Sequence, residues 1–307
     1  MDITDSIINY RRSLKRRNFS KYTIRNYMST LKQFVIWLDI PLEAVTHKKL
    51  LDFIDHLLAK RLKPKTINCY LDSIRGFYDH LICEEQQLKM QNPVKLGDTL
   101  RMSKPLPRFL RDEQVRAVFA QIDDPRDVAI FKLMLRCGLR VEEVAKLTLA
   151  AVDLKRAQVF VYHGKGAKDR VVYLSNDAYQ ALLAYLKVRP FSRAKRLFLV
   201  NKGRFRGQPL NVRGIQHRIK YYSKKAGFKV SCHQLRHTMA TQMLNADADL
   251  VTIQDLLGHA YIRTTERYCR VSNQKVRRDY YRAMDKVIER HSPVGNKRLD
   301  KEEILIN

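Results

Sequence analysis

The sequence predicts a mainly α-helical protein of two domains, the second of which carries one small β-hairpin. Three observations support this fold class. Apolar residues recur at helical spacing through residues 1–90. Residues 91–108 contain three prolines and one glycine and lack that periodicity. Two runs of alternating β-branched and aromatic residues, 158–162 and 170–174, flank a glycine-rich turn at 163–166.

Residues 1–90 predict a domain of four helices, and residues 91–108 predict a linker. The first helix is expected over about 3–17, and the second begins after Ser20, a residue type that caps helix N-termini. The third follows Thr46, and the fourth runs from Pro64, at a position where proline is tolerated, to Cys83.

Residues 109–291 predict the larger domain, which is mostly helical apart from the hairpin. One helix is expected to begin near Arg140 and another near His233. A basic helix is expected over about 273–291, and residues 292–307 form a loosely held tail.

The charge of the chain indicates a polyanionic partner. The sequence has 59 Lys and Arg against 31 Asp and Glu, a net charge of +28. A nucleic acid or an anionic membrane would fit this balance. No apolar run is long enough to span a bilayer, and the N-terminus lacks a signal-peptide pattern. We therefore expect double-stranded DNA and no membrane, with DNA contacts from Lys21, Arg25, Lys63, Lys65, Lys168 and Arg213.

The cysteines and histidines indicate neither a disulfide framework nor a metal site. There are five cysteines, an odd number, and no two form a Cys-x-x-Cys pair. This usage is typical of a reduced, cytoplasmic protein. The nine histidines show no metal-ligand spacing with a carboxylate partner, so we expect no metal.

Several basic side chains could bind a scissile phosphate. Arg140 begins a helix and lies three residues before Glu143; His233 and Arg236 are also three apart near a helix start. Arginine forks grip two phosphate oxygens, and helix N-termini favour anions. Taken alone, the Arg140–Glu143 pair is better explained as an ordinary ion pair on a helix surface, and a His-x-x-Arg pattern is common and a weak signal. Lys165, in the hairpin turn, is by itself better explained as an exposed lysine.

A nucleophile is suggested by position rather than by residue type. The chain has fifteen tyrosines, and Tyr268 is distinguished by lying nine residues after His259, among three arginines. Nearby positive charge favours a phenolate-like oxygen. His237 follows Arg236 directly and is expected to point elsewhere on its helix, where a structural role is favoured over a catalytic one.

Taken in order, these motifs resemble those of the tyrosine recombinases, or phage-integrase-type recombinases, closest to the Xer-type branch and its mobile-element relatives. Residues 138–147 resemble the first arginine box of that family, 164–170 its hairpin lysine motif, 233–241 its second box, and 256–259 with 264–268 its last. The resemblance covers about residues 5–280. It implies the catalytic residues Arg140, Lys165, His233, Arg236, His259 and Tyr268.

The resemblance also implies how the protein works. The first domain would be a core-binding, SAM-like domain, closing on DNA opposite the catalytic domain. The enzyme would need no cofactor, would cut and rejoin DNA core sites through a 3′-phosphotyrosyl intermediate, and would act as a tetramer on DNA. Accessory proteins are a further partner class that the resemblance allows. A DNA-binding protein that does not cleave and a type IB topoisomerase remain alternatives. Chromosome dimer resolution and integration or excision of a mobile element both remain open, and the high charge slightly favours a mobile-element enzyme.

Overall fold

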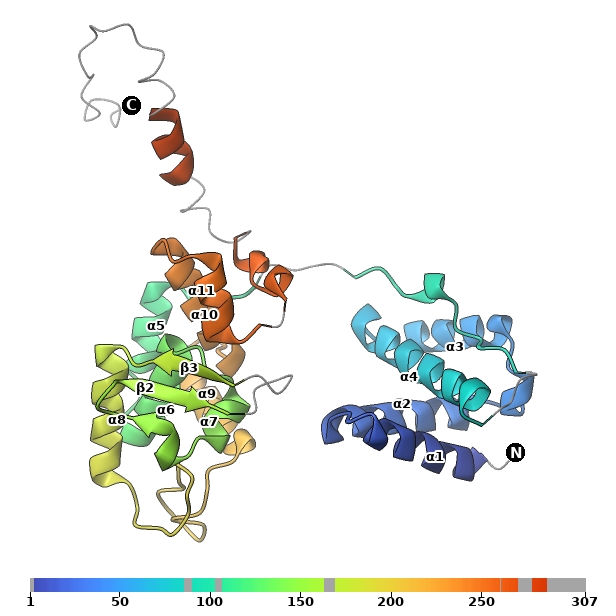
Figure 1. Ribbon diagram of the computed structural model, residues 1–307, viewed down its shortest axis with the longest axis horizontal. Coiled ribbons are helices and arrows are strands. Elements are labelled where there is room, and N and C mark those ends of the chain that lie inside the picture. Colours follow the sequence, from blue (N-terminus) through green and yellow to red (C-terminus); the bar gives the residue numbers. More distant parts are fainter. Residues whose placement is uncertain are drawn as a thin grey trace, which may run out of the picture. The chain divides into compact units, whose positions relative to one another are not determined.

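The computed structural model describes residues 3–85, 90–102, 107–162, 169–259, 261–269 and 278–285. The chain divides into two units, Met1–Lys104 and Pro105–Asn307, each with a hydrophobic core of its own. Within the described ranges no helix is both long and apolar enough to cross a membrane. The elements are labelled along the chain in Figure 1.

The first unit is built from four helices, α1 (Ile3–Arg16), α2 (Lys21–Trp37), α3 (His47–Ala59) and α4 (Pro64–Cys83). The expected helix starts are confirmed. The Ser20 hydroxyl accepts from the Thr23 amide at 3.0 Å, and the Thr46 hydroxyl caps α3 in the same way. Pro64 occupies the first turn of α4, where its missing N–H costs no helical bond.

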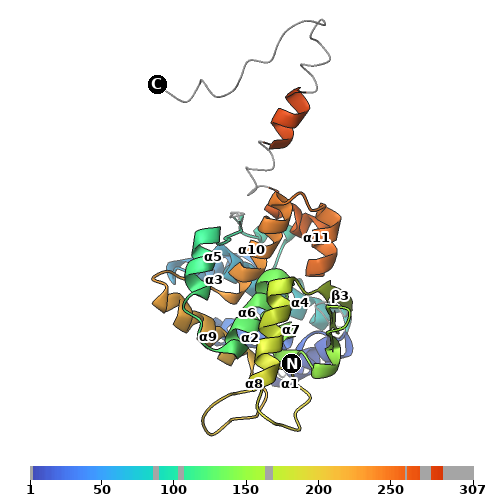
Figure 2. The same ribbon diagram turned by 90° about the vertical axis from the view of Figure 1, so that its left-hand side faces the viewer.

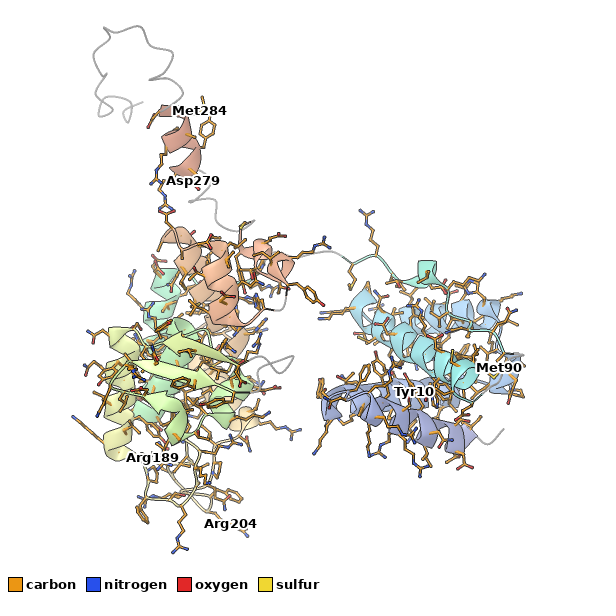
Figure 3. All side chains as sticks on the ribbon, in the orientation of Figure 1. Tyr10, Met90, Arg189, Arg204, Asp279 and Met284 are labelled. Atoms are coloured by element: carbon orange, nitrogen blue, oxygen red, sulfur yellow. The ribbon has the colours of Figure 1, made fainter. Side chains whose placement is uncertain are left out.

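Aromatic residues fill the core of the first unit. Phe34 of α2 meets Phe53 of α3 edge to face, with ring centroids 4.9 Å apart. Tyr10 of α1, labelled in Figure 3, is 1% exposed and packs on Phe77 of α4. These contacts fix the helices relative to one another, so the exposed N-terminal ends of α2 and α4 are held rigidly.

Part of the stretch expected to be a linker packs on the first unit. This unit also has two short turns of 3₁₀ helix, η1 (Leu42–Ala44) and η2 (Leu96–Asp98), and the second of them lies in that stretch. Asn68 of α4 exchanges two hydrogen bonds with the backbone of Leu100, at 3.0 and 2.9 Å. The chain therefore leaves the first unit after these contacts.

The second unit consists mainly of helices and carries one small sheet. Its elements are α5 (Asp112–Phe119), α6 (Pro125–Arg136), α7 (Val141–Lys146), η3 (Leu149–Ala151), β1 (Val152–Asp153), β2 (Gln158–Val161), β3 (Arg170–Tyr173), α8 (Asn176–Val188), α9 (Val212–Lys225), α10 (Cys232–Asn245), α11 (Leu250–Leu257), η4 (Ile262–Thr264) and η5 (Glu266–Tyr268). The predicted mainly α-helical fold with a small β element is confirmed. Residues 278–285 form a further helix.

The sheet is antiparallel, in the order β1-β2-β3. Val159 pairs with Val172, and both side chains are fully buried. The predicted hairpin is present, with each strand one residue shorter than expected. The two-residue strand β1 was not expected, because it is too short to show an alternating pattern.

Helix α6 lies at the centre of the second unit. It packs on α8 and α10, and Figure 2 shows α8 running alongside it. The carboxylate of Asp127 on α6 is fully buried and accepts from Arg218 Nε at 2.5 Å and Tyr222 Oη at 2.9 Å, both on α9. Arg126 binds the same carboxylate at 2.8 Å. This satisfied network fixes α9 against α6.

Arg189 and Arg204, labelled in Figure 3, belong to the long connection between α8 and α9. Arg189 holds that connection to the helix end, since its Nε donates to the carbonyl of Leu197 at 2.9 Å.

Candidate active site

Arg140 stands where a glycine turn enters α7. Gly138 has φ +65°, and a Cβ there would lie 2.9 Å from Leu257 Cδ2, so glycine allows the turn to pack closely on the end of α11. Arg140 caps α7: its backbone N–H and Nη1 each donate to a carboxylate oxygen of Glu143, both at 2.7 Å. Its Nη2 donates to the carbonyl of Gly258 at 3.1 Å.

Glu143 is shared between two arginines. Arg170, the first residue of β3, donates to both of its carboxylate oxygens, at 2.9 and 2.7 Å. Burial raises the pKa of Glu143, but the hydrogen bonds and charge of Arg170 and the bonds from Arg140 outweigh it and lower the pKa to about 2. Glu143 is therefore ionised at neutral pH and holds both guanidiniums in place.

Arg236 lies in the first turn of α10. The Ser231 hydroxyl caps this helix by accepting from the Gln234 amide at 3.3 Å, and the Gln234 side chain accepts from the Ser231 amide at 2.9 Å. Arg236 is 2% exposed, and its guanidinium donates to the carbonyls of Gly138 and Leu257. Burial and the positive charge of Arg140 lower its pKa to about 9, so it stays protonated at neutral pH.

Arg140 and Arg236 both bind the end of α11, and Arg236 also binds the 138–140 turn from which Arg140 projects. Arg140 binds the carbonyl of Gly258, and Arg236 binds the neighbouring carbonyl of Leu257 and that of Gly138. Their guanidiniums therefore converge at the end of α11. Guanidinium forks held in this way are chemically suited to bind the oxygens of a phosphodiester.

His259 follows directly after this anchor point. Gly258 ends α11 with φ +59°, a left-handed cap that turns the chain. His259 Nδ1 lies 2.9 Å from the hydroxyl of Thr265, which is fully buried. Burial and the charges of Arg236 and Arg140 lower the pKa of His259 to about 3, so its ring is neutral and suited to donate a hydrogen bond rather than carry charge.

Tyr268 lies in η5 and is 2% exposed. It packs with apolar residues of α10 and α11, including Met239 and Leu257. Its ring is nearly parallel to that of His259, at 9° and 6.5 Å between centroids. Its hydroxyl lies 2.6 Å from Nδ1 of His237.

The expectation that His237 points elsewhere on its helix was therefore wrong. It does not point away from the candidate site: its imidazole contacts the hydroxyl of Tyr268. The sequence could not show this, because Tyr268 reaches α10 only through the turn after α11. His233 is exposed, and its ring meets that of His237 at 4.0 Å and 68°.

Two of the predicted residues cannot be placed. Lys165 and Lys168 fall in the hairpin turn, outside the described residues. Five of the six predicted catalytic residues are brought together by contacts between the start of α7, α10 and the segment after α11: Arg140, His233, Arg236, His259 and Tyr268. Within the described ranges no three His, Cys, Asp or Glu side chains gather as metal ligands.

The predicted DNA-contacting residues outside the hairpin are all exposed. Lys21 and Arg25 lie on the first two turns of α2, and Lys63 and Lys65 flank the start of α4. Arg213 lies at the start of α9 in the second unit. Helix N-termini with exposed cations suit contacts to a phosphate backbone.

Sequence reasoning missed the roles of Glu143, Arg170 and His237. Glu143 was considered only as a surface partner of Arg140. Arg170 was seen as part of a strand motif. The one indication of their roles was that all three lie inside the motifs that resemble the recombinase family. Local periodicity does not show that β3 meets α7.

The arrangement matches known protein families over most of the chain. Residues 108–275 match the phage integrase family, and residues 7–85 match the phage integrase N-terminal SAM-like domain. The chain belongs to the phage integrase family. The predicted resemblance to tyrosine recombinases is thereby confirmed.

Individual relatives agree with this membership. The chain is 33% identical to Tyrosine recombinase XerC of Bacillus subtilis over 86% of its length and 90% of the relative. It is 34% identical to Tyrosine recombinase XerD of Pseudomonas aeruginosa over 81% of its length and 87% of the relative. Both support the prediction of a tyrosine recombinase enzyme acting in site-specific DNA recombination.

A solved structure shares the fold. A lambda integrase (75-356) dimer bound to a COC′ core site aligns with a TM-score of 0.72, at 18% identity, over 87% of this chain and 95% of that one. Both units therefore share the fold of that integrase.

Proposed function

We propose that this recombinase cleaves and rejoins double-stranded core sites through a 3′-phosphotyrosyl bond to Tyr268. The observation that carries the proposal is the shared anchorage of Arg140 and Arg236 on the carbonyls of Leu257 and Gly258. Those carbonyls immediately precede His259, and the charge of Arg236 reaches both His259 and Tyr268. The phosphate clamp and the nucleophile therefore belong to one site.

In this proposal each residue has one task. The two guanidiniums bind the non-bridging oxygens, where negative charge grows in the transition state. His259, with its proton on Nε2, accepts from Thr265 at Nδ1 and donates to a phosphate oxygen. His233 is assigned a phosphate contact as well, since its exposed ring lies on the first turn of α10. Tyr268 attacks phosphorus in line with the leaving 5′-oxygen.

Lys165 is proposed as the acid that protonates the leaving oxygen. Its motif, on the hairpin between β2 and β3, supports the assignment. A substrate with a 5′-bridging phosphorothiolate has a leaving group that needs no proton. That substrate should restore cleavage to Lys165→Ala and restore it much less to Arg140→Ala; equal recovery would remove the acid role from Lys165.

The biological assembly is part of the proposal. Exchange of strands between two duplexes needs four active sites, so the functional species is a tetramer on DNA, with accessory proteins where the element requires them. A net charge of +28 opposes association without DNA. The first unit would contact the duplex through α2 and α4. DNA as substrate and free cysteines throughout the chain support a cytoplasmic location.

The target site and the nucleophile can be tested together. A nicked suicide duplex is selected from a library of randomised core sites by its cleavage with the wild-type protein, and covalent adducts are resolved on a denaturing gel. Tyr268→Phe should form no adduct while binding the duplex with nearly unchanged affinity. Tyr261→Phe is the matched control, because Tyr261 is 76% exposed on the same segment. Adducts from the Tyr268 variant would show that another residue attacks.

A further inference from the structure

A ring nitrogen of His237 contacts the proposed nucleophilic oxygen. Its Nδ1 lies 2.6 Å from Tyr268 Oη. That distance falls within the range at which a general base can take a proton directly. The family resemblance gives His237 no role, and its position just after Arg236 gave no sign of this contact.

Cleavage needs such a base. A tyrosine hydroxyl has an ordinary pKa of about 10 and keeps its proton at neutral pH. Its oxygen attacks phosphorus effectively only as the proton leaves. A neutral imidazole, with an ordinary pKa near 6.5, can accept this proton in the physiological range.

His259, another histidine of the site, is less suited to the task. His259 Nδ1 is engaged by Thr265, and its ring lies parallel to Tyr268 with 6.5 Å between centroids. Burial and the neighbouring arginines lower its pKa to about 3, which makes it a very weak base. The exposed ring of His233 contacts the ring of His237.

We propose that His237 is the general base that accepts the proton of Tyr268 during DNA cleavage and returns it during religation. The inference rests on the proposed function, because it takes Tyr268 as the nucleophile. His237 holds its own proton on Nε2 and presents Nδ1 to the hydroxyl. It is half-buried on α10, and Tyr268 is fixed in the apolar cluster beside it.

The step balances as follows. Tyr268 Oη forms a bond to phosphorus, and the bond from phosphorus to the 5′-oxygen breaks with its electron pair on that oxygen. The phenol proton passes to His237 Nδ1, which becomes an imidazolium. The leaving oxygen takes a proton from the proposed acid, Lys165. Religation runs the same transfers in reverse and restores both residues.

Titratable and charged groups lie on the elements that pack around His237. Its own helix contributes His233 and Arg236, and η5 contributes Tyr268 and the exposed Glu266. The segment after α11 adds His259, and Asp255 is exposed on α11. Helix α6 also packs on α10, but its Lys132 and Arg136 bind Asp177 on α8, at 2.7 and 2.9 Å.

The test is the pH dependence of single-turnover cleavage on the selected suicide duplex, over about pH 5 to 9. The wild-type rate should rise with pH as His237 loses its proton and then level off. His237→Asn keeps an acceptor near the Tyr268 hydroxyl but cannot take its proton. That variant should cleave about 10²-fold more slowly and lose the rise near neutral pH. His217→Asn, at an exposed position on α9, is the matched control and should keep the wild-type profile.

A second measurement uses an attacking phenol that depends less on a base. Fluorotyrosine at position 268 has a more acidic phenol, so it should speed cleavage by His237→Asn more than cleavage by the wild type. His237→Ala, which opens a space beside Tyr268, should recover activity with added imidazole. A structural role for His237 would produce neither effect. DNA affinity and melting temperature show whether each variant is folded.

The outcomes separate this inference from the proposed function. If His237→Asn cleaves with the wild-type rate and pH profile, His237 is not the base. The assignment of Tyr268 as the nucleophile would still stand if Tyr268→Phe forms no adducts. Should His237→Asn fail to fold, fluorotyrosine in the otherwise unchanged protein decides. If the cleavage rate rises at the same pH with tyrosine and with fluorotyrosine at position 268, the rise is assigned to His237. If the pH of the rise shifts with the acidity of the phenol, the proposal is overturned.

Discussion

The guanidinium of Arg170 holds both carboxylate oxygens of Glu143, at 2.9 and 2.7 Å. Its Nε also donates to the carbonyl of Leu256 at 2.8 Å, and its side chain packs against Gly258. Glu143 in turn holds Arg140. Arg170 therefore joins the strand that follows the proposed Lys165 loop to the arginine clamp and to the end of α11.

This relationship predicts that Arg170→Lys impairs cleavage although Arg170 need not touch DNA. Lysine cannot grip both carboxylate oxygens, so Arg140 would lose its fixed orientation. Single-turnover cleavage should slow on the order of 10–10²-fold, the cost of a small misplacement of catalytic groups. Arg156→Lys, 75% exposed in the β1–β2 turn, is the control on the same sheet and should cleave normally. Equal rates in the two variants would remove the positioning role.

Glu143 predicts a loss of stability in acid. Its pKa is lowered from 4.5 to about 2 in the folded protein, so the ionised carboxylate stabilises the fold above about pH 4.5. That contribution, at most about 3 kcal/mol, is lost as the pH falls from 4.5 toward 2. Urea unfolding of the wild type and of Glu143→Gln should therefore differ most near neutral pH and converge in acid. A difference independent of pH would contradict the assigned ion pair.

The elements of the fold could largely be predicted from the sequence, because their signals are local. Ser20, Thr46 and Pro64 mark helix starts by chemistry confined to one turn. The strand β1 was missed because two residues are too few to show an alternating pattern.

Contacts between residues far apart in the sequence were not predictable. The bonds of Arg236 to Gly138 and Leu257, and of His237 to Tyr268, depend on how α7, α10 and α11 pack, and periodicity contains no information on that packing.

The arginine clamp predicts a large loss of rate without a large loss of binding. Arg236→Ala should slow cleavage by about 10²-fold or more, the scale for one preorganised charge stabiliser, ~3 kcal/mol. Arg236→Lys should recover little, because it cannot bind the Gly138 and Leu257 carbonyls and a phosphate together. Rates are measured with saturating protein on the suicide duplex. Full activity in Arg236→Lys would rule out the bidentate geometry.

The exposed lysines and arginine of the first unit predict the salt dependence of binding. Each phosphate neutralised contributes about −0.9 to the slope of log affinity against log salt. Replacing Lys21, Arg25, Lys63 and Lys65 with glutamine should flatten the slope by about 0.9 for each phosphate that these side chains neutralise in the wild type. Lys187→Gln, exposed on α8, should leave it unchanged. A slope that does not move in the fourfold variant would place these residues away from DNA.

The chain after Tyr268 predicts how proteins cooperate on DNA. Residues 278–285 form a helix on which Tyr280 is 58% exposed, a large aromatic surface available to a neighbouring protomer. Arg278 of the same helix donates to the carbonyl of Asn245 at 3.2 Å and pairs with Asp247, which is contact within its own chain. The two observations point to different roles, docking in trans and packing in cis.

Truncation after Ser272 separates these roles. If the helix docks in trans, the truncated protein should bind one half-site with unchanged affinity and lose cooperative filling of paired half-sites. Tyr280→Ser should reproduce that loss, whereas Arg278→Ala, which breaks only the contact with the end of α10, should not. Binding is measured by mobility shift on single and paired half-sites, with melting temperature as the check on folding. A truncated protein that melts lower but still fills paired sites cooperatively would assign the helix to its own catalytic unit, since packing in cis stabilises a fold without linking one protomer to the next.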